Sequence, residues 1–90
     1  MIKIFKYEIP VNDEIELDLP KGAKVLTIQL QKGVPCIWML VNPDLSTEKR
    51  LFWLYGTGME VKQTHLNYLG SFQMLGGDLI FHLFGEITAF

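Results

Sequence analysis

Apolar and polar residues alternate along much of this chain with the two-residue period of a β-strand. Residues 14–19 alternate strictly, with three apolar side chains on one face and three carboxylates on the other. Residues 25–31 follow the same period, which predicts burial of Leu26, Ile28 and Leu30. We therefore expect both segments to be strands with one face on a core and the other on water.

Two further segments are apolar on both faces. Residues 51–55 carry no polar group except the hydroxyl of Tyr55, and residues 36–41 form a second apolar run. Strands that read as continuous apolar runs are usually covered on both faces. We expect residues 51–55 to form the central strand, with both faces covered. Residues 36–41 are expected to be enclosed by the fold or presented to another subunit.

Turn residues mark the limits of other strands. Residues 2–9 form a first strand near an edge, and Pro10 ends it because proline cannot donate to a ladder. Pro20-Lys21-Gly22 predicts a type I turn that joins its two flanking strands as an antiparallel pair. Gly76-Gly77 predicts a two-residue hairpin turn, because both glycines accept a positive φ without a steric penalty.

The last two strands are predicted over residues 67–75 and 78–84, on either side of that glycine pair. In the first of them the two-residue period puts Tyr68 on the same face as Phe72. Gly70 interrupts the pattern and marks a bulge or a close approach of another backbone.

No stretch of ten residues has the period of a helix, so the predicted fold class is all-β. About seven short antiparallel strands form a small sandwich or a partly open barrel. Residues 1–90 make a single β domain with room for one core. Because so short a chain leaves much of its surface exposed, and because two of its strands are apolar on both faces, we expect a homo-oligomer.

Charge and cysteine content narrow the class of partner. The net charge is −2 and the eight lysines and arginines are scattered, which argues against nucleic acid as a partner. Cys36 is the only cysteine, so the chain forms no internal disulfide and suits a reducing compartment. Lysines interrupt the apolar residues at the start of the chain, so no signal peptide or membrane span is predicted there. We expect a cytoplasmic protein.

The residues that could carry chemistry are few. His82 lies in the middle of a predicted strand, where a histidine with satisfied ring nitrogens is the favoured reading. Cys36 and His82 are the one candidate pair of nucleophile and base. However, Cys36 lies in an apolar run, where burial lowers the reactivity of a thiol. The histidines and the cysteine match no metal-ligand spacing. We therefore predict no catalytic residue, no metal, no cofactor and no enzymatic activity.

The aromatic side chains give the best ligand hypothesis. Aromatic rings are able to stack on a planar molecule while neighbouring polar groups form hydrogen bonds with its edge. Gly56-Thr57-Gly58 adds a candidate phosphate nest, although a strand-ending turn is the favoured reading. Packing in the core is the alternative for the aromatics. The predicted ligand-binding residues are Arg50, Trp53, Tyr55, Thr57, Trp38, Gln73 and His82.

Acidic residues form the densest charge cluster, at Asp13, Glu14, Glu16 and Asp18. A solvated face that keeps an edge strand from pairing is the favoured reading. The alternative is a surface that docks onto a basic partner.

Seven segments of the chain match a known sequence pattern. They are residues 4–7 (IFKY), 19–26 (LPKGAKVL), 33–38 (GVPCIW), 47–50 (TEKR), 55–58 (YGTG), 68–73 (YLGSFQ) and 76–84 (GGDLIFHLF). In these segments the chain resembles a family of small proteins of unknown function associated with bacteriophages and prophages.

The resemblance implies a phage-type setting in the host cytoplasm, where small proteins without enzymatic equipment commonly act stoichiometrically on the host. Our first hypothesis is a host-defence antagonist that traps a small nucleotide-like signal at a subunit interface. The alternatives are an inhibitor that blocks a host defence protein by direct contact and an accessory or structural component of the virion.

Overall fold

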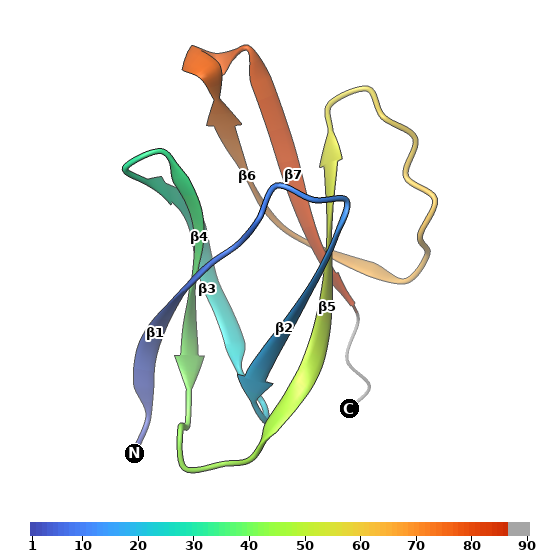
Figure 1. The fold of residues 1–90 in the computed structure, drawn as a ribbon. Coiled ribbons are helices and arrows are strands. Elements are labelled where there is room, and N and C mark those ends of the chain that lie inside the picture. Colours follow the sequence, from blue (N-terminus) through green and yellow to red (C-terminus); the bar gives the residue numbers. More distant parts are fainter. Residues whose placement is uncertain (87–90) are drawn as a thin grey trace.

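Two antiparallel sheets make up the fold in a computed structural model that describes residues 1–86 (Figure 1). The smaller sheet has the order β1 (Lys3–Glu8), β4 (Val34–Val41), β3 (Lys24–Gln31). The larger sheet has the order β2 (Glu14–Pro20), β5 (Thr47–Gly56), β7 (Leu79–Glu86), β6 (Leu66–Met74). The predicted all-β class with about seven antiparallel strands is confirmed, and the sheets are not closed into a barrel.

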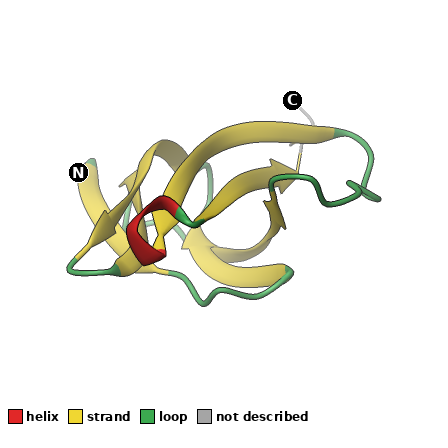
Figure 2. Cartoon of the chain, turned by 90° about the horizontal axis from the view of Figure 1, so that it is seen from above, coloured by secondary structure: helices red, strands yellow, loops and turns green. Residues whose placement is uncertain are grey.

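The only helical element in residues 1–86 is a single 3-10 turn, η1 (Leu75–Gly77), drawn in red in Figure 2. Nothing in this described part of the chain is a helix long and apolar enough to cross a membrane.

The core lies between the inner faces of the two sheets. Ile15 and Leu19 come from β2, as the alternation of residues 14–19 predicts. β5 and β7 add Phe52, Leu54 and Leu83 from the same sheet. The smaller sheet supplies the opposing layer from Ile28, Ile37, Met39 and Val41.

The turn after β2 forms, but it does not make the predicted hairpin. The amide of Ala23 donates to the carbonyl of Pro20 (3.1 Å), and Gly22 at the third position has a φ of 76°. The turn is therefore type II and the prediction of type I is wrong, because glycine accepts the positive φ that type II needs there. β2 then pairs with β5, and β3 pairs with β4. The turn therefore carries the chain from one sheet to the other, because the apolar faces of β2 and β3 cover the core from opposite sides.

A β-bulge at Leu26 changes the burial predicted for β3. Val25 pairs with Met39 and Thr27 with Trp38, so Leu26 has no partner in the ladder. Leu26 is 46% exposed, whereas Val25 packs against the core. The prediction of a buried Leu26 is wrong, because the extra residue shifts the alternation by one position.

A second bulge reverses the faces predicted at the start of β6. Tyr68 pairs with Phe84 and Gly70 with Leu83, so Leu69 is the residue left out of the ladder. Leu69 packs against the core and Tyr68 faces outward, contrary to the prediction that Tyr68 shares a face with Phe72. The bulge predicted near Gly70 is therefore present, at the neighbouring Leu69. Gly70 is also a site of close approach, but to a side chain instead of a backbone, because a Cβ there would lie 2.7 Å from Cγ2 of Ile28 on β3.

The loop between β6 and β7 is longer than predicted. Met74 and Leu79 form the last pair of this hairpin, which leaves a four-residue loop instead of a two-residue turn. Leu75 takes a φ of 52° and leaves the strand, and the amide of Asp78 donates to its carbonyl (3.1 Å). The hairpin itself forms as predicted.

β5 is an inner strand of the larger sheet, between β2 and β7, as predicted. Phe52 and Leu54 are buried on its inner face, but Leu51, Trp53 and Tyr55 on its outer face are only partly covered. Within residues 1–86 no second layer lies over that outer face, so the expectation that both faces are covered is not met by a single chain.

β4 is the central strand of the smaller sheet, and its inner face is buried in the core. On the outer face Cys36 is 1% exposed. The ammonium group of Lys6 on β1 donates to Oε1 of Gln31 on β3 (2.6 Å), so this hydrogen bond spans β4. The thiol of Cys36 lies 3.4 Å from the carbonyl oxygen of Val34.

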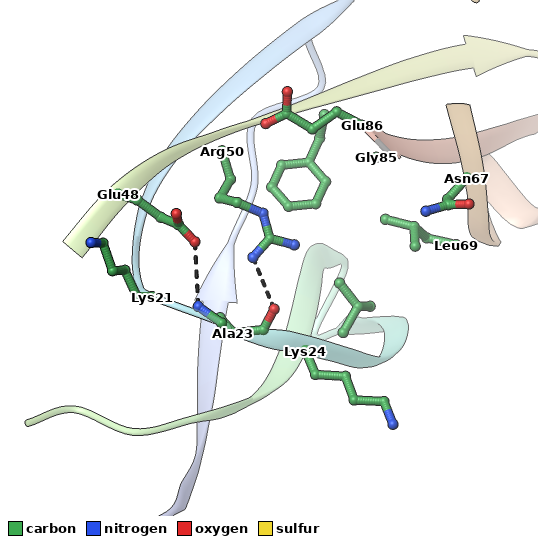
Figure 3. A pocket seen from close by; sticks show the side chains of 12 residues that line it. Lys21, Ala23, Lys24, Glu48, Arg50, Asn67, Leu69, Gly85 and Glu86 are labelled. Atoms are coloured by element: carbon green, nitrogen blue, oxygen red, sulfur yellow. Dashed lines mark hydrogen bonds between the residues drawn. The ribbon is translucent and has the colours of Figure 1, made fainter. Parts of the chain in front are cut away.

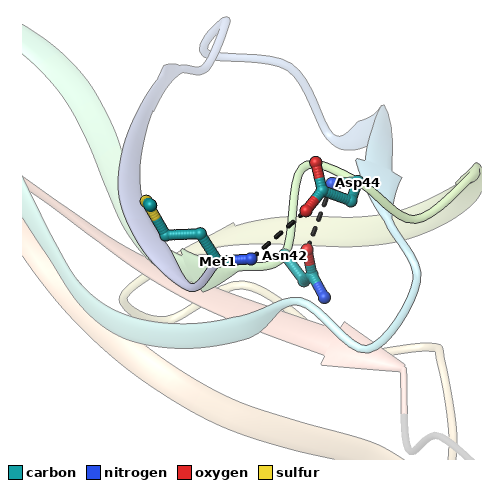
Figure 4. Close-up of polar contacts among 3 residues, drawn as sticks. All are labelled: Met1, Asn42 and Asp44. Atoms are coloured by element: carbon teal, nitrogen blue, oxygen red, sulfur yellow. Dashed lines mark hydrogen bonds and ion pairs between the residues drawn. The ribbon is translucent and has the colours of Figure 1, made fainter.

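The start of the chain is tied to the loop between β4 and β5 (Figure 4). The amino group of Met1 forms an ion pair with Oδ2 of Asp44 (3.2 Å). The amide of Asp44 donates to Oδ1 of Asn42 (3.1 Å), which fixes the loop that presents the carboxylate. Both charged groups are exposed, so this pair contributes little to stability.

Candidate functional site on the outer face of the larger sheet

Aromatic side chains from three strands meet on the outer face of the larger sheet. Strand pairing places Trp53 of β5, Phe84 of β7 and Tyr68 of β6 in one row across the sheet. Tyr55 and His82 form the next row. We call this set the outer aromatic face.

Phe84 lies at the centre of the outer aromatic face. Its ring makes edge contacts with Tyr55 (5.7 Å between ring centroids) and with Tyr68 (5.3 Å). These are the geometries that aromatic pairs prefer. The cluster is therefore packed within itself, although no second layer from residues 1–86 covers it.

Both ring nitrogens of His82 have hydroxyl partners. Nε2 lies 2.8 Å from Oγ1 of Thr57 and Nδ1 lies 2.9 Å from the hydroxyl of Tyr68. In a neutral imidazole one nitrogen donates and the other accepts, so one hydroxyl accepts a hydrogen bond and the other donates one. The reading of His82 as a satisfied histidine is confirmed. Cys36 lies on the other sheet, so the alternative nucleophile and base pair does not form.

The Gly56-Thr57-Gly58 segment is a strand-ending turn that holds Thr57 beside His82. The amide of Thr57 donates to the carbonyl of Ile80 (3.1 Å), and the amide of Met59 donates to the carbonyl of Gly56 (3.0 Å). The amide of Gly56 lies 3.2 Å from the sulfur of Met59. Because these amides already have acceptors within the chain, they do not converge on an anion.

An acidic row borders the outer aromatic face. Glu14, Glu16 and Asp18 are exposed on β2, which is an edge strand as the favoured reading of this cluster requires. Lys49 on β5 forms an ion pair with Glu16 (2.7 Å). The hydrogen bond to Glu16, with the charges of Glu16 and Asp18, raises the pKa of Lys49. Within residues 1–86, Glu14 and Asp18 form no ion pair.

The structure gathers most of the predicted ligand-binding residues and separates two of them. Trp53, Tyr55, Thr57, Gln73 and His82 lie on or at the end of the outer face of the larger sheet.

Arg50 and Trp38 do not join that set. Arg50 points to the inner side of β5, because it is an odd number of residues from Trp53 and Tyr55 along a strand that alternates. Trp38 lies on the outer face of the smaller sheet. Phe72 is buried in the core and stacks on Phe81 (5.6 Å between ring centroids), so for this aromatic residue the alternative of packing in the core holds.

Arg50 lies instead in a hollow of about 670 Å³ between the two sheets (Figure 3). The guanidinium donates to the carbonyl of Ala23 (2.8 Å) and lies 6.0 Å from the ring centroid of Phe52. Sequence reasoning named Arg50 but not this hollow, because its walls come from β3, β5, β6 and β7 together.

A family model described as Domain of unknown function (DUF7352) matches residues 1–89. The chain belongs to this family. The resemblance to a family of unknown function is thereby confirmed, and the match covers nearly the whole chain. No curated protein and no solved structure matches this chain. Among residues 1–86 of the DUF7352 domain, no group of three histidine, cysteine or acidic side chains is placed to hold a metal ion.

Proposed function

We propose that this DUF7352 protein is a non-enzymatic binding protein that acts by stoichiometric contact with another protein, through its outer aromatic face. The observation that carries the proposal is the exposure of Tyr68, which is 57% exposed beside Phe84 and His82. Tyrosine and tryptophan are the residues most enriched among those that dominate binding energy at protein interfaces.

The internal contacts of the face support this role. Edge contacts with Phe84 hold Tyr55 and Tyr68 in place before any partner arrives, and a hydrogen bond between Tyr68 and His82 fixes Tyr68 further. A preorganised surface loses less side-chain entropy when it binds.

The acidic row indicates the chemistry of the partner. Glu14, Glu16 and Asp18 lie along one side of the aromatic cluster, so a partner with an apolar patch bordered by lysines or arginines would be complementary to both parts. In the phage-type setting that the resemblance implies, that partner is a host defence protein. Recovery of the chain in purified phage particles, with no soluble complex, would favour a virion component instead.

Replacement of Trp53 with alanine tests this surface. Trp53 is a half-buried outward residue of the face, between Phe84 and the acidic row, and loss of an aromatic side chain that anchors an interface is expected to weaken a protein complex by about 30-fold or more. Trp38→Ala is the matched control, because Trp38 is equally half-buried on the central strand of the other sheet. The measurement is native mass spectrometry of each variant isolated from host cells, after circular dichroism has shown that it is folded.

The expected result is a protein complex of fixed stoichiometry with the native chain and with Trp38→Ala, and its loss with Trp53→Ala. A complex lost with Trp38→Ala and kept with Trp53→Ala would contradict the proposal. So would a native chain that carries a small molecule and no protein.

A second candidate function is the capture of a nucleotide-like signal at a subunit interface. Trp53 and Tyr55 line a hollow of about 250 Å³ together with Lys62 and Gln63. We rank it second because Asp13, Glu14 and Glu60 line the same hollow, and carboxylates repel phosphate. A rise in melting temperature with a nucleotide, abolished by Trp53→Ala, would reverse this order.

We also propose that the chain forms a homo-oligomer through the smaller sheet. Ile2, Ile4, Leu40 and Leu45 are all exposed, Ile4 is the ladder neighbour of Leu40, and Ile2, Leu40 and Leu45 line a shallow hollow of about 350 Å³. Burial of this patch against a second copy would remove apolar surface from water.

Light scattering at micromolar concentration is expected to give a mass above that of one chain, and Ile4→Lys to lower it to one chain. Leu79→Lys is the control, since Leu79 is an exposed apolar residue on β7 of the larger sheet. A native mass of one chain would remove this proposal.

A further inference from the structure

The hollow around Arg50 has the size and the opening of a small-molecule site. Its volume of about 670 Å³ lies within the range of about 300–1,000 Å³ that ligand sites occupy. It lies on the inner side of β5, so it is separate from the outer aromatic face.

Arg50 is half-buried in this hollow and is held in one orientation. One nitrogen of its guanidinium donates to Ala23, and the group lies over the ring of the buried Phe52. Among residues 1–86 no carboxylate lies within ion-pair distance of Arg50. A guanidinium has five N–H donors in a rigid fork that suits carboxylate and phosphate groups. Its remaining donors therefore suit an anion that enters the hollow.

The two carboxylates that line the hollow are held by backbone amides. Oε2 of Glu48 accepts from the amide of Gly22 (3.3 Å), and Oε1 of Glu86 accepts from the amide of Leu51 (3.0 Å). These hydrogen bonds explain why both acidic side chains are found at the walls while the guanidinium of Arg50 faces the open space (Figure 3).

The charge of the hollow differs in sign from that of the chain. Lys21, Lys24 and Arg50 line it against Glu48 and Glu86, an excess of one positive charge, whereas the whole chain has a net charge of −2. Lys21 and Lys24 both point away from Arg50, so the guanidinium is the positive group closest to the middle of the hollow (Figure 3). An anion is therefore attracted to this part of an otherwise acidic protein.

We propose that the hollow binds a small organic anion, with its carboxylate or phosphate group on Arg50 and its apolar body against Val25 and Leu69. Both of these apolar side chains are partly exposed and line the hollow. The proposal is independent of the outer aromatic face, because no residue of that face lines this hollow.

Calorimetric titration of the full chain tests the proposal with three probes, which are phenyl phosphate, benzoate and inorganic phosphate. Phenyl phosphate and benzoate share an apolar ring and differ in the anionic group, whereas inorganic phosphate has no apolar body. We expect at least one ringed probe to bind more tightly than inorganic phosphate. The preferred ringed probe identifies the anionic group.

Arg50→Met is expected to weaken the preferred probe by about tenfold or more, since it removes a charged hydrogen-bond donor. Lys49→Met is the matched control, because it removes the same charge from the adjacent residue, which faces the other side of β5. The affinity of Lys49→Met for the preferred probe should stay within about twofold of the native value, since exposed charges are screened. Trp53→Ala should also bind the probe normally.

Asn67→Glu provides a second test that leaves Arg50 and its bond to Ala23 in place. Asn67 is an exposed residue at the wall of the hollow, so a carboxylate there should repel the probe. Absence of binding by the native chain at millimolar probe would overturn the proposal. Equal losses in Arg50→Met and Lys49→Met, or unchanged binding in Asn67→Glu, would overturn it as well.

Discussion

Gly70→Ala is expected to lower the free energy of unfolding by about 3 kcal/mol, the sum of about 2 for overpacking and about 1 for backbone strain. The new methyl group would lie 2.7 Å from Cγ2 of Ile28, inside the contact between β6 and β3. The backbone at Gly70 also has a φ of 150°, which L residues rarely adopt. Urea denaturation followed by circular dichroism measures the loss.

Gly22→Ala is the control for backbone strain alone. Gly22 also has a positive φ, but a Cβ there meets no atom within 4 Å. We expect a loss of about 1 kcal/mol. Equal losses at Gly22 and Gly70 would contradict the steric contact. Addition of Ile28→Ala to Gly70→Ala should cost less than the sum of the two single changes, because it removes the atom that the new methyl group meets.

Ile28→Ala and Leu26→Ala are expected to differ strongly, although both are apolar residues of one strand. Ile28 is 6% exposed and part of the core, so its truncation should cost about 2–5 kcal/mol. Leu26 is 46% exposed at the bulge, so its truncation should cost about 1 kcal/mol or less. The same denaturation experiment compares them. Equal losses would show that residues 25–31 form a regular strand without the bulge.

The alternation of apolar residues predicted which segments are strands, and it placed side chains correctly wherever the ladder is regular. Ile15 and Leu19 on β2 are buried as expected. The bulges at Leu26 and Leu69 were not predictable from alternation, because a bulge is defined by the pairing with the neighbouring strand. Only Gly70 carried a local signal of irregular structure.

Strand partners were harder to predict than strands. A tight turn at Pro20-Lys21-Gly22 fits a hairpin and a sheet-to-sheet connection equally well, since both need the same local conformation. The observed partner of β2 is β5, far along the chain, and the choice between β3 and β5 depends on how the whole core is covered. No local pattern contains that information.

The candidate site was predicted in part for the same reason. Alternation along β5 groups Trp53 with Tyr55, and alternation along β7 groups His82 with Phe84. Phe84 was absent from the predicted set, although the period that placed His82 also placed it on the outer face. Arg50 could have been separated from Trp53 by the same rule, because the two lie an odd number of residues apart.

The order of strand pairing has a consequence for how this chain is made. β1 and β2 are translated before their partner strands, because Lys3 pairs with Val41 and Glu14 pairs with Trp53. β1 and β2 therefore remain unpaired until β4 and β5 have been translated. Folding that depends on such distant pairings takes on the order of milliseconds to seconds, and in that interval the nascent β1, with Ile4 and Phe5, is open to aggregation or to a chaperone.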